Sequence, residues 1–290
     1  MAQNENKIQS WDGETLFIRS WRTAKPVGTI VVTHGLGEHS GSYKYLAEGL
    51  KDSGFSLHAW DLRGHGQSGG RRGVLRTWSD YTRDLVEVVD HIKKNELKGE
   101  PLILLAHSMG GLVLVKALLD HGDMGARAFA LSSPLFGIAV PVPAIKRKGA
   151  VVLAKLAPNF TMSNELKYED LTSDPKVIAD HYADKLRHDR TSSVLYLQMV
   201  AAMADSLARA GQIKLPALVM QAADDVIVSP KAARQLFDAL GSADKKWIEY
   251  PGYKHEIFNE LNRPAVFADL RAWLSRWTVA QASTAQTHVR

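Results

Sequence analysis

The chain has 290 residues, 45% of them hydrophobic and 23% charged, a balance typical of a soluble globular protein large enough for one α/β domain with an insertion. The net charge of +5 comes from scattered Lys and Arg residues; it favours an anionic membrane surface but is too weak to indicate nucleic-acid binding. The sequence has no cysteine, so disulfides, thiol catalysis and zinc–thiolate sites are excluded.

The N-terminal residues Met1 to Ser10 are polar and lack the pattern of a signal peptide. No apolar run approaches the roughly 20 residues needed to span a bilayer. We therefore expect a cytoplasmic protein that has the option of peripheral membrane contact. The sequence leaves the oligomeric state open.

In the first half of the chain, short apolar strands alternate with amphipathic helices. The predicted strands cover residues 15–21, 28–33, 56–60, 102–105 and 128–132. The predicted helices cover residues 43–51, 81–93 and 112–119. This alternation predicts an α/β fold with a mostly parallel sheet covered by helices on both faces.

The alternation breaks in the middle of the chain and then resumes. Between residues 134 and 214 we predict no strand, only helices over 143–156, 175–186 and 192–210. After this block come predicted strands at 216–221 and 245–250 and helices at 230–240 and 263–277. We therefore expect a core formed by residues 1–133 and 215–290, with residues 134–214 inserted as a helical cap.

The segment from Pro101 to Gly111 has the character of a sharp strand-to-helix turn around Ser108. Ala106 and Gly110, two residues to either side, are small enough to allow that turn. The pattern is G-x-S-x-G with alanine in the first position, and it puts the serine hydroxyl at a helix N-terminus, where developing negative charge is favoured. We interpret Ser108 as a nucleophile; the alternative is that small residues only let a helix pack closely on a strand.

A glycine-bearing loop, residues 34–37, follows the strand at 28–33. Such a loop can aim a backbone N–H at the surroundings of the nucleophile. The N–H groups of Leu36 and Met109 are therefore the candidate oxyanion hole. Without the serine turn, we would interpret this loop as an ordinary connection.

Two further strand ends carry an acid and a histidine. Asp224 and Asp225 follow the strand at 216–221, and the residues alone do not separate them. His255 lies in a glycine-bearing loop between the last strand and the last helix. Active sites of open α/β sheets form at the carboxyl ends of strands, and the order Ser, Asp, His along the chain is that of α/β-hydrolases.

These motifs together resemble the α/β-hydrolase superfamily, and within it the monoacylglycerol lipase and lysophospholipase group, which includes the serine aminopeptidase S33-type hydrolases. The stretches that carry the resemblance are His34–Tyr43, Asp61–Ser68, His107–Gly111, Asp225–Val228 and Tyr253–Glu256. The resemblance spans residues 10 to 278 and is loosest in the cap. Ser42 departs from it, because many relatives have arginine at this position.

The resemblance implies an α/β-hydrolase fold and a serine ester hydrolase that releases a fatty acid from monoacylglycerols or lysophospholipids. It assigns Ser108 as nucleophile, Asp225 as the acid and His255 as the base, and it implies an acyl-enzyme and no metal or organic cofactor. The expected partner is a small lipid ester, with no nucleic acid. The alternatives are a general carboxylesterase or an aminopeptidase of the same superfamily; a non-catalytic binding protein is disfavoured because the triad is complete.

The cap combines an apolar surface with neighbouring basic residues. The apolar residues are Val140, Val142, Ile145, Val151, Val152, Leu153 and Leu156, and the basic ones are Lys146, Arg147, Lys148 and Lys155. One interpretation is a lid that docks on a lipid surface and feeds an acyl chain inward. The other is a helix packed on its own domain with a solvated basic face.

Overall fold

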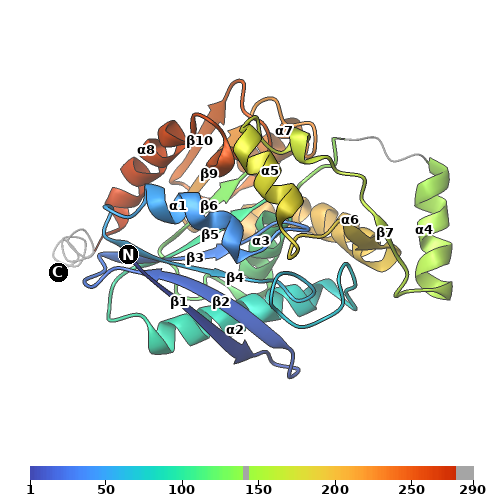
Figure 1. Cartoon of the computed structure of the whole chain (residues 1–290), viewed down its shortest axis with the longest axis horizontal. Helices are drawn as coiled ribbons and strands as arrows, with labels where there is room; N and C mark the ends of the chain where they lie inside the picture. The colour runs from blue at the N-terminus through green and yellow to red at the C-terminus, as the bar shows by residue number, and fades with distance from the viewer. Residues whose placement is uncertain (140–143, 279–290) are drawn as a thin grey trace.

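The computed structural model describes residues 1–139 and 144–278, which are built around an eight-stranded sheet with the order β1-β2-β4-β3-β5-β6-β9-β10 (Figure 1). Its strands are β1 (Ala2–Gln9), β2 (Thr15–Arg22), β3 (Gly28–Thr33), β4 (Phe55–Trp60), β5 (Leu102–His107), β6 (Ala128–Ser132), β9 (Ala217–Ala222) and β10 (Lys245–Tyr250). The six strands from β4 to β10 in this order are parallel, and β1 and β2 form an antiparallel hairpin at one edge. The predicted α/β fold is confirmed.

Helices cover both faces of the sheet (Figure 1). They are α1 (Lys44–Gly49), α2 (Trp78–Asn95), α3 (Met109–His121), α4 (Ala144–Leu156), α5 (Pro175–Ala183), α6 (Ser193–Arg209), α7 (Pro230–Ala239) and α8 (Arg263–Leu274). Short 3-10 helices lie at Ser40–Tyr43, Tyr168–Asp170, Ala210–Gln212, Ile257–Asn259 and Ser275–Trp277.

The alternation of side chains along the central strands creates two hydrophobic cores. Val31 of β3 points to the core that α2, α3 and α7 share, whereas its neighbours Ile30 and Val32 point to the core beneath α1 and α8. Because helices cover both faces of the sheet, the sequences of these strands are continuous apolar runs. The two cores fix where the carboxyl ends of β3, β5 and β9 lie, and these ends carry the site.

The predicted elements of the core are all present, with ends that differ by at most three residues. The start predicted for the first cap helix, at Pro143, lies outside the described residues. The prediction of no strand between 134 and 214 is wrong: β7 (Thr161–Ser163) and β8 (Arg190–Ser192) pair antiparallel. Strands of three residues are too short to show a period of two, so the sequence gives no signal for them.

The strand β1 is a further element that the sequence did not reveal. Six of its eight residues are polar, and almost all are exposed. It forms because residues 2–9 pair along the whole of β2, from Ala2 opposite Arg22 to Gln9 opposite Thr15. Backbone pairing, not side-chain burial, therefore holds this edge strand.

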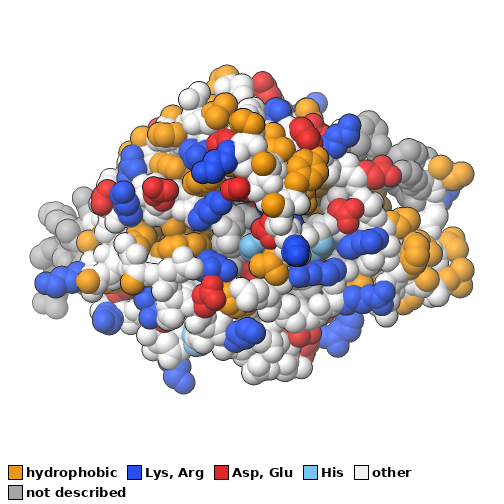
Figure 2. Space-filling model, in the orientation of Figure 1, with side chains coloured by type: hydrophobic (Ala, Val, Ile, Leu, Met, Phe, Trp, Pro, Cys, Tyr) orange, Lys and Arg blue, Asp and Glu red, His pale blue; other side chains and the backbone are white. Residues whose placement is uncertain are grey.

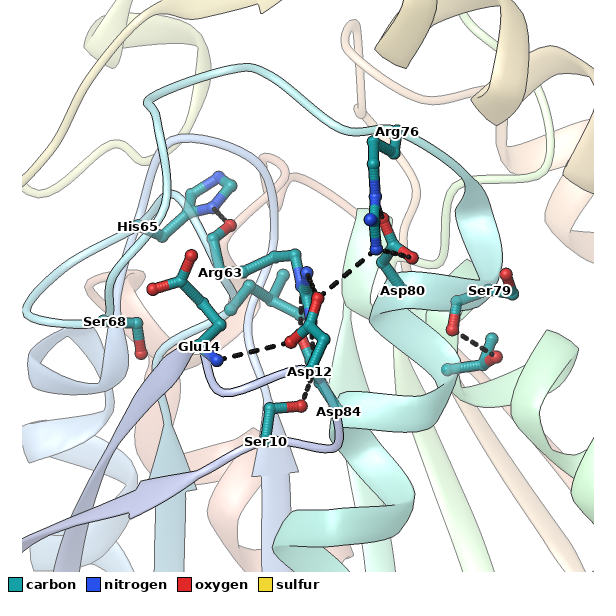
Figure 3. A network of polar contacts seen from close by, with 12 residues as sticks. Ser10, Asp12, Glu14, Arg63, His65, Ser68, Arg76, Ser79, Asp80 and Asp84 are labelled. Atoms are coloured by element: carbon teal, nitrogen blue, oxygen red, sulfur yellow. Dashed lines mark hydrogen bonds and ion pairs between the residues drawn. The ribbon is translucent and has the colours of Figure 1, made fainter.

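A buried arginine ties the β1–β2 hairpin to the loop after β4 (Figure 3). The Arg63 guanidinium donates to both carboxylate oxygens of Asp84 on α2, at 2.6 Å each, and to both oxygens of Asp12 in the hairpin turn, at 2.9 and 3.1 Å. Burial raises the pKa of Asp84, which is fully buried, so the carboxylate depends on its partners to remain charged. The backbone N–H of Leu62, next to Arg63, donates to His34 Nε2 at 2.9 Å, so this loop also supports the segment that follows β3.

Replacing Arg63 with methionine removes the partner of two carboxylates, one of them fully buried. We expect the free energy of unfolding to fall by about 3–5 kcal/mol, because an uncompensated buried charge remains. Urea denaturation followed by circular dichroism measures this change. Arg76→Met is the matched control: its side chain is 68% exposed and contacts Asp12 and Asp80 at 3.3 Å, so we expect a loss of no more than about 1 kcal/mol. Equal losses in the two variants would contradict the account.

Candidate active site

Ser108 occupies a strained turn between β5 and α3. Its backbone has φ 51° and ψ −123°, a left-handed conformation that L-residues other than glycine rarely adopt. The turn is possible because Gly110 has no side chain: a Cβ there would lie 2.4 Å from the carbonyl oxygens of Thr33 and His34. The serine hydroxyl is thereby lifted to the N-terminus of α3, above the carboxyl end of the sheet. Ala106, which replaces the first glycine of the G-x-S-x-G pattern, is fully buried within the core.

The structure brings Ser108, His255 and Asp225 into one chain of hydrogen bonds. Ser108 Oγ lies 2.8 Å from His255 Nε2, and His255 Nδ1 lies 2.7 Å from Asp225 Oδ2. All three residues are buried. Because Nδ1 faces a carboxylate, it carries the proton, and Nε2 is free to accept one from the serine hydroxyl.

The two neighbouring aspartates that the residues alone did not separate have different surroundings. Asp225 is buried, and its Oδ1 accepts hydrogen bonds from the backbone N–H groups of Ile227 and Val228 at 2.9 and 3.0 Å. Asp224 is exposed to solvent. The carboxylate that contacts His255 is therefore that of Asp225.

The candidate oxyanion donors lie on the loops that flank the serine. Gly35 brings the first loop close, since a Cβ on it would lie 2.9 Å from Ser108 Cβ. Within the part of the chain that the structure describes, the backbone N–H groups of Leu36 and Met109 donate to no other group. Both are therefore available to an oxygen atom bound beside Ser108.

The environment of His255 favours its charged form. Burial alone would lower the pKa of this imidazole, but the charge of Asp225 and its hydrogen bond raise it above the ordinary value. Burial would raise the pKa of Asp225, and the interaction with His255 lowers it instead. The acid thus stays ionised beside the histidine, which is the arrangement that stabilises an imidazolium formed during proton transfer.

A second layer of buried polar side chains, which the sequence analysis did not identify, lies behind His255. The His107 ring packs on the His255 ring, with centroids 4.6 Å apart. Glu38 Oε1 accepts from the backbone N–H of Gly35 at 2.5 Å, and Glu256 accepts from Arg187 and His181, each at 2.8 Å. Glu38 and Glu256 belong to the quoted motifs, but Arg187 and His181 come from the segment between residues 134 and 214, and no local pattern marks them.

Ser42 also contacts one of these buried side chains, Arg187. Arg187 Nη1 donates to Ser42 Oγ at 3.2 Å. A guanidinium group therefore lies beside the position at which the resemblance led us to expect an arginine, but it comes from Arg187, between α5 and β8. Among residues 1–139 and 144–278, no group of three or more His, Asp or Glu side chains is arranged to hold a metal ion.

Comparisons with known proteins agree with this architecture. The sheet order, the helices on both faces and the serine at the turn after β5 are those of the α/β-hydrolase class. The family model described as "Serine aminopeptidase, S33" matches residues 24–262, and the chain belongs to this family.

Individual relatives have lipid-related names. The chain is 33% identical over 251 residues to a monoacylglycerol lipase of Mycolicibacterium smegmatis, covering 86% of this chain and 88% of that protein. It is 30% identical over 259 residues to the phospholipase YtpA of Bacillus subtilis, covering 89% and 99%. A longer relative, an uncharacterized abhydrolase domain-containing protein of Dictyostelium discoideum, is 28% identical, and the match spans only 29% of its length.

Among solved structures, the monoacylglycerol lipase of Paleococcus ferrophilus superposes with a TM-score of 0.78 at 29% sequence identity, covering 94% of this chain and 98% of that one. These relationships make the chain a serine ester hydrolase of the monoacylglycerol-lipase-like group. None of the helices in the described residues is long and apolar enough to cross a membrane.

Proposed function

We propose that this hydrolase cleaves monoacylglycerols to a fatty acid and glycerol, with Ser108 as nucleophile, His255 as general base and Asp225 as the acid that orients His255. The observation that carries the proposal is the unbroken hydrogen-bond chain from Ser108 Oγ through His255 to Asp225, with distances of 2.8 and 2.7 Å. The names of the relatives from Mycolicibacterium smegmatis and Paleococcus ferrophilus support the substrate class.

The mechanism follows from this geometry. His255 Nε2 accepts the Ser108 proton as Oγ attacks the ester carbonyl, and Asp225 stabilises the imidazolium that forms. The N–H groups of Leu36 and Met109 hold the oxyanion of the tetrahedral intermediate. His255 then donates its proton to the departing glycerol oxygen. In the second half, His255 takes a proton from the water that attacks the acyl-enzyme carbonyl. His255 then returns this proton to Ser108 Oγ as the C–Oγ bond breaks and the fatty acid leaves.

Lysophospholipid hydrolysis is the second candidate, because the relative YtpA is named a phospholipase and is covered almost completely. Both candidates use the same triad and differ only in the alcohol that leaves. A general carboxylesterase would cleave short esters alone, and an aminopeptidase, the activity in the description of the family, would cleave an amide bond.

We further propose that residues 134–214 form a cap that contacts lipid surfaces through α4. Figure 2 shows hydrophobic side chains gathered at the end of the molecule where α4 lies in Figure 1. The exposed apolar residues of this patch are Ile145, Val151, Val152, Leu156, Phe160 and Met162. Val140 and Val142, which the sequence analysis assigned to the same surface, lie outside the described residues. Exposed Lys148 and Lys155 on the same helix suit an anionic membrane surface.

The substrate assignment is tested by fatty-acid release from a long-chain 1-monoacylglycerol. We expect the wild-type chain to hydrolyse this substrate, a matching lysophospholipid to be cleaved more slowly, and Ser108→Ala to lower turnover by about 10⁴-fold or more. Titration of the released acid measures all three rates. Cleavage of a short nitrophenyl ester without cleavage of the long-chain ester would contradict the lipase assignment and favour a general carboxylesterase.

The role of the acid is tested by a pair of adjacent substitutions. Asp225→Asn should lower kcat by about 10⁴-fold, since an amide at this position no longer stabilises the imidazolium or holds the useful tautomer. Asp224→Asn, in the exposed neighbour, should retain most of the wild-type rate. Steady-state kinetics with the same ester provide the comparison. Similar losses in both variants, or a larger loss at Asp224, would overturn the assignment.

Membrane contact is tested by co-sedimentation with anionic phospholipid vesicles. Ile145 and Leu156 are 81% and 80% exposed, so the double substitution Ile145→Glu/Leu156→Glu should lower the vesicle partition coefficient by about 10-fold or more. Hydrolysis of a short, soluble ester should be unchanged. Leu261→Glu, at a 58% exposed leucine outside the cap, is the control and should bind vesicles as the wild type does. Equal binding by the α4 variant would exclude this patch as the contact.

A further inference from the structure

The segment between α5 and β8 contacts both the loop of the proposed base, His255, and the loop of the proposed oxyanion donor, Leu36. Arg187 and His188 are consecutive residues between α5 and β8. The Arg187 guanidinium donates to Glu256 Oε1 at 2.8 Å, and the backbone N–H of His188 donates to the carbonyl oxygen of Gly37 at 3.0 Å. Glu256 directly follows His255, and Gly37 directly follows Leu36. The cap therefore touches the loop of the base and the loop of the oxyanion donor through neighbouring residues.

The contact made by Arg187 is a buried charge contact. The Arg187 side chain is 3% exposed, and the Glu256 side chain 4% exposed. Glu38 is also buried, and its carboxylate, like that of Glu256, lies in the field of Arg187. Attraction of this kind is far stronger in the protein interior than at the surface, and salt screens it little.

Other ionisable groups face the same region from each element around it. Those that face His255 are Asp225 after β9, His107 at the end of β5, Glu38 after β3 and Glu256 on its own loop. Those that face Arg187 or Glu256 from residues 134–214 are His181 on α5, Asp184, and Tyr168, whose ring lies 5.3 Å from the guanidinium. Those that face Glu38 are His34 and Tyr43, whose hydroxyl donates to Glu38 at 3.2 Å. In this set Arg187 is the group that stays positively charged at every working pH, because guanidinium does not deprotonate in proteins.

The charge of Arg187 changes the pKa of His255 in a defined direction. Glu38 and Glu256 both raise the pKa of His255, after the larger effects of burial and Asp225. A cation beside these carboxylates offsets part of their potential, so the imidazole loses its proton at a lower pH. Without the cation, His255 would stay protonated, and inactive as a base, up to a higher pH.

We propose that Arg187 is a positioning residue, supplied by the cap, that offsets the buried Glu38 and Glu256 carboxylates behind His255 and so sets the pH at which His255 works as the base. The proposal rests on the proposed function of His255. The same Arg187 guanidinium reaches Glu256, which directly follows the base, and Ser42.

The test is the pH dependence of kcat/KM for a short, soluble ester, measured on the full chain from about pH 5 to about pH 9, the range in which imidazoles titrate. The acid limb of this profile is the part in which kcat/KM rises with pH as His255 loses its proton. For Arg187→Gln we expect the acid limb to move to higher pH by about half a pH unit or more. Glu256→Gln should move it to lower pH, and the double variant should fall between the two. Arg187→Lys, which keeps the charge, should stay close to the wild type.

Arg190→Gln is the matched control, because Arg190 lies on the same segment with its side chain 54% exposed, 3.7 Å from Asp189. Its acid limb should coincide with that of the wild type. If Arg187→Gln lowers kcat/KM equally at all pH values, Arg187 has only a structural role and the proposal is wrong. If that variant does not fold, an unshifted limb in Glu256→Gln overturns the proposal instead. Absence of hydrolysis by the wild type, or activity that survives Ser108→Ala, would instead refute the proposed function.

Discussion

The close approach of two backbone loops at the carboxyl ends of β3 and β5 is the constraint on which the site depends. Gly35 and Gly110 lie at this approach, and a methyl group at either would meet Ser108 Cβ or the carbonyl oxygens of Thr33 and His34 within 3 Å. Because β3 and β5 are neighbours in the sheet, the serine and the candidate oxyanion donors reach the same point. The strained backbone of Ser108 persists because both loops are anchored: Ser108 N–H donates to the Ser132 carbonyl, and His34 Nε2 accepts from Leu62 N–H.

Two buried carboxylates, Asp84 and Glu256, are paired with arginines from distant parts of the chain. Arg63 fixes the loop after β4 by binding Asp12 and Asp84, and Arg187, between α5 and β8, binds Glu256. Asp84 and Glu256 are buried and would be costly to bury alone, so each arginine makes its loop dependent on an element far away in the sequence. The segment between α5 and β8 is coupled to the rest of the chain in the same way, since Arg187 and His188 contact the two loops that we propose carry the base and an oxyanion donor.

Most of the core could be predicted from the sequence because its signals are local. Continuous apolar runs predict the buried strands β3, β5 and β6. The small residues around Ser108 predict a tight turn within a few positions. β7 and β8, at three residues each, and the polar strand β1 carry no such signal, because pairing with a distant strand decides them. Likewise Asp225 differs from Asp224 only in burial and partners, and Arg187 matters only because the chain folds it against Glu256.

The central claim is that His255 activates Ser108 as a nucleophile, and covalent labelling with a fluorophosphonate followed by peptide mass mapping tests it most directly. The account predicts a single label, located on Ser108, that forms more slowly as the pH falls and His255 becomes protonated. It also predicts that Ser108→Ala takes up no label and that His255→Ala labels far more slowly than the wild type. A label on another residue, or labelling of Ser108 at an undiminished rate without His255, would contradict the account.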